Sequence, residues 1–96
     1  MNHQELVAAI ARRLPDRSRR EVAEVLAVMT DICIEQLSRP GRVVQIADLG
    51  RLSIDVHQLQ AAGAVEPKTL TRIVGRFRLA WRLRQAIELA IEEELH

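Results

Sequence analysis

Basic side chains form the one group in this chain whose type and spacing suggest a chemical role. Six lysines and arginines fall between residues 67 and 87 with no acidic residue among them, namely Lys68, Arg72, Arg76, Arg78, Arg82 and Arg84. In an extended strand the three arginines of segment 72–78 would share one side, opposite Ile73 and Phe77. A guanidinium group can bridge two phosphate oxygens through its planar fork of donors. We therefore expect these six residues, together with Arg51, to contact the phosphates of a nucleic acid.

No comparable pattern predicts catalysis or metal binding. The three histidines, His3, His57 and His96, are scattered, and Cys33 is the single cysteine. The sequence also lacks a glycine-rich phosphate loop and a nucleophile elbow. We expect a protein that is not an enzyme and that uses no metal, cofactor or small-molecule substrate.

Length and composition limit the protein to one small domain. It has 96 residues, of which 48% are hydrophobic and 28% charged, and this mixture is typical of a globular chain. The apolar runs are far shorter than the ~20 residues that cross a bilayer, and the lone cysteine suits a reducing compartment. We expect a single domain over 1–96 in a soluble cytoplasmic protein. The net charge of +1 does not by itself indicate a nucleic-acid partner.

Two helices are predicted in the first half of the chain. Asn2 with Glu5 fits an N-cap followed by an acidic first turn, and helical apolar spacing continues to about residue 14. Ser18 and Glu21 form a capping box, which opens a second helix over about 18–38. The pair Pro40-Gly41 ends it.

Strands and a last helix are predicted in the second half. Short apolar or alternating segments indicate strands at about 43–46, 51–58 and 72–78. Gly75 marks a bulge or a close backbone approach in the third of these strands. Residues 59–71 lack periodicity and are expected to form a loop or an arm, and a helical pattern covers about 79–95.

The apolar stripe of the second helix is too wide to be covered within so small a monomer. An isologous dimer would bury the surplus, because a two-fold interface lets the stripe pack against its own copy. The expected interface residues are Val25, Met29, Ile32, Cys33, Leu37 and Phe77.

The order and spacing of these segments resemble the HU/IHF family of bacterial DNA-binding proteins. Residues 41–50, Gly-Arg-Val-Val-Gln-Ile-Ala-Asp-Leu-Gly, are similar to the family pattern G-x-x-V-x-L-x-G-F-G. Residues 74–78, Val-Gly-Arg-Phe-Arg, are similar to its V-P-x-F-K stretch, and Leu83-Arg84 to the basic start of its last helix. Trp81 stands where HU often has Lys.

The resemblance implies an α+β fold and a DNA-bending function. Two N-terminal helices, a three-stranded antiparallel sheet with a β-arm and a C-terminal helix would form an intertwined homodimer, or a heterodimer with a related subunit. Its sheets would form a saddle for the DNA backbone, and Pro67 would be the candidate wedge at the tip of each arm. The arm departs from the family, since residues 58–65 carry no cation and Glu66 stands where Asn is expected. The returning limb from Pro67 to Phe77 is also shorter than that of HU, so we expect a shortened arm.

We therefore expect a non-enzymatic architectural protein of the nucleoid, which binds double-stranded DNA with little sequence preference and bends or compacts it. One alternative keeps the HU-like dimer but makes it a protein-interaction or structural module with weak or no DNA binding. A third interpretation makes the first two helices a helix-turn-helix that reads the major groove. The wide apolar stripe of the second helix is more typical of a dimer helix than of a recognition helix.

Overall fold

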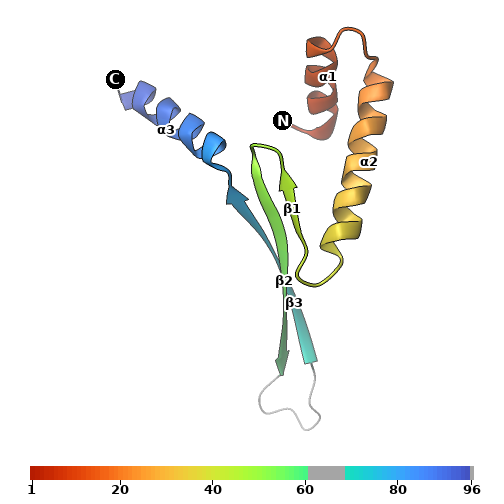
Figure 1. Cartoon of the computed structure of the whole chain (residues 1–96), viewed down its shortest axis with the longest axis vertical. Coiled ribbons are helices and arrows are strands. Elements are labelled where there is room, and N and C mark those ends of the chain that lie inside the picture. Colours follow the sequence, from red (N-terminus) through yellow and green to blue (C-terminus); the bar gives the residue numbers. More distant parts are fainter. Residues whose placement is uncertain (61–68, 96) are drawn as a thin grey trace. The chain divides into compact units, whose positions relative to one another are not determined.

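A computed structural model describes residues 1–60 and 69–95 of the chain. The elements follow one another as α1, α2, β1, β2, β3 and α3 (Figure 1). The chain divides into two compact units, residues 1–35 and 36–96, and each unit is described by itself. That the whole chain is one domain stays a prediction.

Helix α1 (His3–Arg13) begins at the cap that the sequence predicts. The side chain of Asn2 accepts a hydrogen bond from the backbone N–H of Glu5 at 2.8 Å, which satisfies one of the free donors of the first turn. The helix ends at Leu14, whose N–H donates to the carbonyl of Ile10 at 3.0 Å. It is one residue shorter at each end than expected, because Asn2 and Leu14 are its caps.

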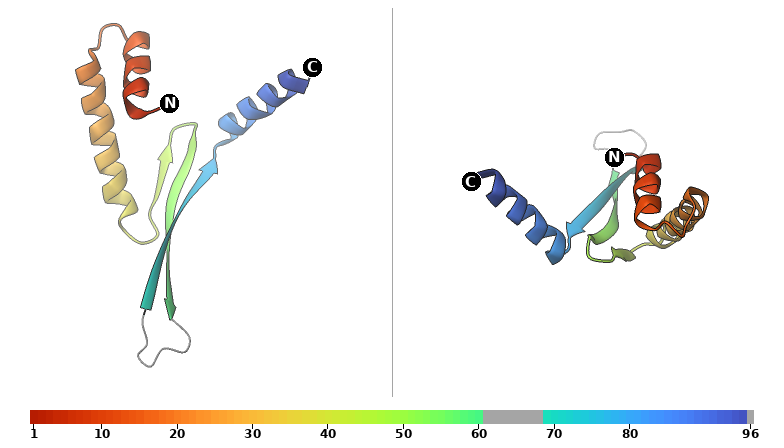
Figure 2. Two further views of the ribbon diagram at one scale, coloured as in Figure 1. Left: turned by 180° about the vertical axis from the view of Figure 1, so that it is seen from behind. Right: turned by 90° about the horizontal axis from the view of Figure 1, so that it is seen from above.

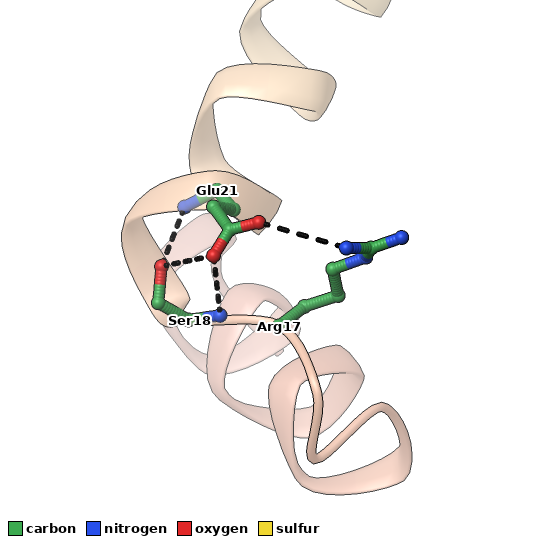
Figure 3. A network of polar contacts seen from close by, with 3 residues as sticks. All are labelled: Arg17, Ser18 and Glu21. Carbon is green, nitrogen blue, oxygen red and sulfur yellow. Dashed lines mark hydrogen bonds and ion pairs between the residues drawn. The ribbon is translucent and has the colours of Figure 1, made fainter.

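Helix α2 (Arg19–Leu37) is opened by the predicted capping box, drawn in Figure 3. The backbone N–H of Glu21 donates to Ser18 Oγ at 3.1 Å, and the N–H of Ser18 donates to Glu21 Oε1 at 3.3 Å. Arg17 lies 3.9 Å from the other carboxylate oxygen of Glu21. The cap at Ser18 therefore fixes where α2 starts.

The first unit has a small core between α1 and the first part of α2. The two helices run antiparallel, as Figures 1 and 2 show. Val7 and Val22 are buried, at 8% and 6% exposure, and they are the buried apolar side chains of the described residues. Val25, Met29 and Ile32 lie farther along α2 and are exposed. Much of the apolar stripe of α2 is thus uncovered.

A tight turn follows α2 at Pro40-Gly41. The N–H of Arg42 donates to the carbonyl of Arg39 at 3.3 Å, and Gly41 has a φ of +74°. Pro at the second position and a positive φ at the third are features of a type II turn, in which glycine is favoured. The predicted helix stop is confirmed.

The second unit contains an antiparallel sheet in the order β1-β2-β3. Strand β1 is Val43–Ile46, β2 is Gly50–Gln60 and β3 is Thr69–Leu79. Strands β2 and β3 are longer than the expected 51–58 and 72–78, so part of the expected arm over 59–71 is paired sheet. Backbone pairing continues here because it does not require the apolar alternation on which the sequence prediction rested.

The register of β2 and β3 corrects the expectation for Gly75. Pairing runs without interruption from Gly50 opposite Leu79 to Gln60 opposite Thr69, so there is no bulge at Gly75, which faces Ile54. A Cβ on Gly75 would lie 3.7 Å from the nearest atom of Ile54, an ordinary contact. Close approach is found at Gly50 instead, where a Cβ would lie 2.7 Å from Phe77 Cζ and would collide with the carbonyl of Arg78.

Helix α3 (Trp81–Leu95) starts two residues later than expected, because Leu79 completes β3. The N–H of Ala80 donates to the carbonyl of Leu49 at 2.9 Å, which ties the start of α3 to the turn between β1 and β2. From there α3 extends away from the sheet (Figures 1 and 2). None of the helices in the described ranges is long and apolar enough to span a membrane.

Candidate nucleic-acid interface

Four arginines share one side of the β2–β3 hairpin, and we call this side the basic face. It consists of Arg51, Arg72, Arg76 and Arg78. The register places Arg51 opposite Arg78, Ser53 opposite Arg76 and His57 opposite Arg72. Since successive side chains of a strand point to opposite sides, these four arginines point the same way. All four are exposed, so the expected shared face is present and open to solvent.

Two cations face each other directly at the base of the hairpin. Arg51 and Arg78 are register partners, and directly opposed like charges destabilise a sheet. In the part of the chain that the structure describes, neither has an ion-pair partner. Both border a hollow of about 390 Å³, whose other lining residues are Gln45, Ala47, Gly50, Leu79 and Ala80. The site combines uncompensated positive charge with space beside it.

Farther along the hairpin, a carboxylate accompanies Arg76. Asp55 lies on the same side of β2, and its Oδ2 forms an ion pair with Arg76 Nε. The side chain of Arg76 is 66% exposed, so the pair lies in water, where such contacts contribute about 0–1 kcal/mol. The sequence interpretation placed no carboxylate near these arginines. Arg76 is therefore partly neutralised, whereas Arg72 has no ion pair among the described residues.

At the start of α3, the two arginines that we expected to contact phosphates differ in whether a carboxylate pairs with them. Arg82 Nη1 donates to Asp48 Oδ2 at 2.9 Å, so a carboxylate of the β1–β2 turn, and not an external anion, compensates this cation. The pair also offsets the unfavourable interaction between a cation and the positive end of the helix dipole. Arg84 is exposed and has no ion pair within residues 1–60 and 69–95.

Two of the expected site residues, Lys68 and Pro67, lie outside the described residues. Their roles as a phosphate contact and as the wedge stay predictions.

The expected dimer-interface residues are distributed over both units. Val25, Met29 and Ile32 are exposed along α2, and Phe77 is exposed on the side of the hairpin opposite the basic face. Cys33 and Leu37 are half-buried. Exposed apolar side chains at such spacing are available for an interface.

Sequence reasoning missed the two carboxylates, Asp48 and Asp55, as partners of candidate arginines. It also missed that Gln45 lies beside the Arg51–Arg78 pair. For Asp55 and Gln45 the signal was the strand register, and for Asp48 it was the hydrogen bond that ties the start of α3 to the β1–β2 turn. The sequence alone provided neither. Among the described residues, no group of three or more His, Cys, Asp or Glu side chains could hold a metal ion.

Comparison with known proteins decides the family. The model of the family described as bacterial DNA-binding protein matches residues 1–88, which is nearly the whole chain. The chain belongs to this family, the HU/IHF family. It is a family of DNA-binding proteins and not of enzymes.

A solved HU structure has the same fold. The HU protein of Anabaena, crystallised with DNA, is 21% identical and superposes with a TM-score of 0.65, over 91% of this chain and 97% of that chain. The HU-like α+β fold expected from the sequence is thereby confirmed. No curated protein sequence matches this HU/IHF member.

Proposed function

We propose that this HU/IHF protein is an architectural protein of the nucleoid, which binds the backbone of duplex DNA as a homodimer and bends it. The phosphates are bound by Arg51, Arg72 and Arg78 of the basic face and by Arg84 at the start of α3. Arg76 and Arg82 contribute less, because each already faces a carboxylate. Contacts of this kind carry no base code, so the sequence preference is weak.

The opposed pair of Arg51 and Arg78 is the observation that carries the proposal. Two exposed guanidinium groups held side by side repel each other in the free protein, and a phosphate group between them converts that repulsion into two attractive contacts. The amide of Gln45 borders the same hollow and can donate to a further phosphate oxygen. Without an anionic partner, the opposed cations only destabilise the hairpin.

A second copy is needed for stability as well as for binding. Val7 and Val22 alone are buried among the apolar side chains of the described residues, whereas large apolar side chains on α2, β3 and α3 are exposed. Folding cannot be sustained by so small a core, because burial of apolar area is the dominant favourable term. A homodimer would cover these surfaces and double the number of basic faces, and the contacts with both faces would repay the energy of bending the DNA.

The test compares binding to a ~30 bp duplex at several salt concentrations by fluorescence anisotropy. Arg51→Ala with Arg78→Ala should weaken binding at least about tenfold at low salt. It should flatten the slope of log affinity against log salt by ~1.8 for each pair of lost phosphate contacts, since each contact contributes ~0.9. Bending is measured on the same duplex with a donor and an acceptor dye at its ends.

The matched control removes the same charge elsewhere. Arg12→Ala with Arg13→Ala deletes two exposed cations from the last turn of α1, and it should leave the salt slope close to that of the parent. If both double variants lose affinity equally, net charge governs binding and the basic face has no special role.

A second candidate is an HU-fold dimer that serves as a protein-interaction module. It is favoured by the pairing of Arg76 and Arg82 with carboxylates and by the net charge of +1. Absence of binding to the duplex even at low salt would select this candidate and reject the first.

A further inference from the structure

A histidine lies on the same side of the hairpin as the basic face. His57 follows Arg51, Ser53 and Asp55 at every second position of β2, so its side chain points to the same side as theirs. Its register partner on β3 is Arg72, and both side chains are exposed. Directly opposed residues of an antiparallel pair have Cβ atoms about 4.5–5.5 Å apart. The imidazole is therefore within reach of an anion that Arg72 binds.

The charged groups that face His57 come from β2 and β3. Strand β1 pairs with Gly50–Ser53 and does not extend to His57. On β3 the group opposite the imidazole is the guanidinium of Arg72. On β2 the neighbouring charged group of this side is Asp55, whose carboxylate already forms an ion pair with Arg76. His57 has no ion-pair partner within residues 1–60 and 69–95.

The charge of a histidine depends on pH, unlike that of the arginines around it. Histidine is the side chain that changes its charge between about pH 5 and 8, whereas a guanidinium stays charged throughout. A protonated imidazole donates hydrogen bonds from both ring nitrogens and would add one cation to the basic face. A neutral imidazole adds no charge. The number of cations that this side of the hairpin offers to phosphates therefore rises as the pH falls.

We infer that DNA binding by this protein is coupled to proton uptake at His57, which holds a phosphate together with Arg72. A phosphate between the two side chains is attracted by two cations when the imidazole is protonated and by one when it is neutral. Bound DNA therefore favours the protonated imidazole, and by linkage protonation strengthens DNA binding. The inference rests on the proposed function, because it assigns a regulator, the proton, to the same basic face.

The experiment measures the affinity for duplex DNA as a function of pH. Anisotropy titrations of the full-length protein with a ~30 bp duplex are made at about pH 6, 7 and 8 and at several salt concentrations. We expect an affinity at least about fivefold higher at pH 6 than at pH 8, and a salt slope steeper by up to ~0.9 for each protonated imidazole that contacts a phosphate. Calorimetry in two buffers of different ionisation enthalpy should show proton uptake on binding near pH 7.

Three variants assign the effect to His57, whose exposed side chain can be replaced without disturbing the packing of the hairpin. His57→Gln stays polar but uncharged, so its affinity should change less than about twofold between pH 6 and pH 8, and the proton uptake should be lost. His57→Arg carries a permanent cation and should bind at pH 8 about as tightly as the parent binds at pH 6. His3→Gln, the matched control, removes an exposed histidine of α1 and should keep the full pH dependence.

Asp55 is a second group on this side of the hairpin that can take up a proton. Its protonation would free Arg76 and would also strengthen binding at low pH. Asp55→Asn removes this route, so the variant should retain the pH dependence of the parent. Loss of the dependence in Asp55→Asn, together with its persistence in His57→Gln, would overturn the inference.

The outcomes distinguish this inference from the proposed function. Equal affinity for the duplex from pH 6 to pH 8, or a pH dependence that His57→Gln retains, overturns the inference and leaves DNA binding intact. If the duplex does not bind at low salt at any of these pH values, the proposed function fails and the inference fails with it.

Discussion

Two carboxylates each pair with one arginine of this protein and so reduce the number of arginines that are free to bind a phosphate. Asp55 holds Arg76, and Asp48 holds Arg82, whereas Arg51, Arg78, Arg72 and Arg84 have no ion pair in the described part of the chain. A phosphate must compete with the carboxylate at the first two positions. The number of phosphate contacts that we propose is therefore smaller than the number of basic residues.

Removal of the carboxylate at Asp55 should strengthen DNA binding. Asp55→Asn frees Arg76, so the affinity for duplex DNA should rise several-fold and the salt slope should steepen by ~0.9, the contribution of one added phosphate contact. Anisotropy titrations at three or more salt concentrations measure both quantities.

The control for this variant is Asp31→Asn, which makes the same charge change on the exposed surface of α2. It should leave the slope unchanged. An equal gain of affinity in both variants would show a general charge effect, and the competition between Asp55 and phosphate would be rejected.

At the scale of the elements, Gly50 allows the start of β2 to pack closely against the end of β3. Gly50 is the buried residue at the start of β2, and its missing side chain lets the carbonyl of Arg78 and the ring of Phe77 approach the backbone. The contact positions the end of β3, from which α3 departs. The basic face and the start of α3 therefore depend on this one backbone approach.

Gly50→Ala should destabilise the protein by about 2–3 kcal/mol, as overpacking of a tight site does. For a chain of this size the melting temperature should fall by roughly 10 °C or more. Thermal unfolding followed by circular dichroism measures the change.

Gly75→Ala provides the matched comparison in the opposite strand. Its new methyl group would meet Ile54 at an ordinary 3.7 Å, so stability should change little or rise by up to about 1 kcal/mol as the unfolded chain loses freedom. If the two variants lose stability equally, the close backbone approach does not explain why residue 50 is a glycine.

Local signals in the sequence predict the helices better than they predict the site. The caps at Asn2 and Ser18 depend on residues three positions apart, and both are confirmed. The pairing of Asp55 with Arg76 depends on the register of two strands, and these residues are far apart in the sequence. Hydrophobic alternation shows that Arg72, Arg76 and Arg78 share a side, but it does not show what lies opposite them.

At the scale of the whole molecule, most of the apolar stripe of α2 is exposed to solvent in the single copy. Val25, Met29 and Ile32 are spaced by four and three residues and are 68%, 43% and 52% exposed. Family membership and the fold are shared with HU, but the second copy itself is inferred from these exposed surfaces. The sequence indicated the stripe because apolar periodicity is local, whereas the geometry of a dimer is not.

Met29→Glu should dissociate the proposed homodimer. Two-fold symmetry places the new charge in the interface twice, so the dimerisation affinity should fall at least about a hundredfold, because an unpaired charge is costly to bury. Sedimentation velocity should show a shift from dimer to monomer, and DNA affinity should fall with it.

Ala27→Glu adds the same charge on another side of α2, where the residue is exposed. This control should sediment as the parent does. A dimer that persists in Met29→Glu would exclude this stripe as the interface.

The facing pair of Arg51 and Arg78 should lower the thermal stability of the DNA-free protein and, by the same repulsion, favour DNA binding. Repulsion between the two cations raises the free energy of the DNA-free fold, and any multivalent anion that settles between them relieves it. Sulfate should therefore raise the melting temperature more than chloride does at equal ionic strength, and Arg51→Gln should abolish much of that difference while stabilising the DNA-free protein. In a cell, the protein released from DNA would be the form most readily unfolded and degraded, so its abundance would follow the amount of DNA available to it.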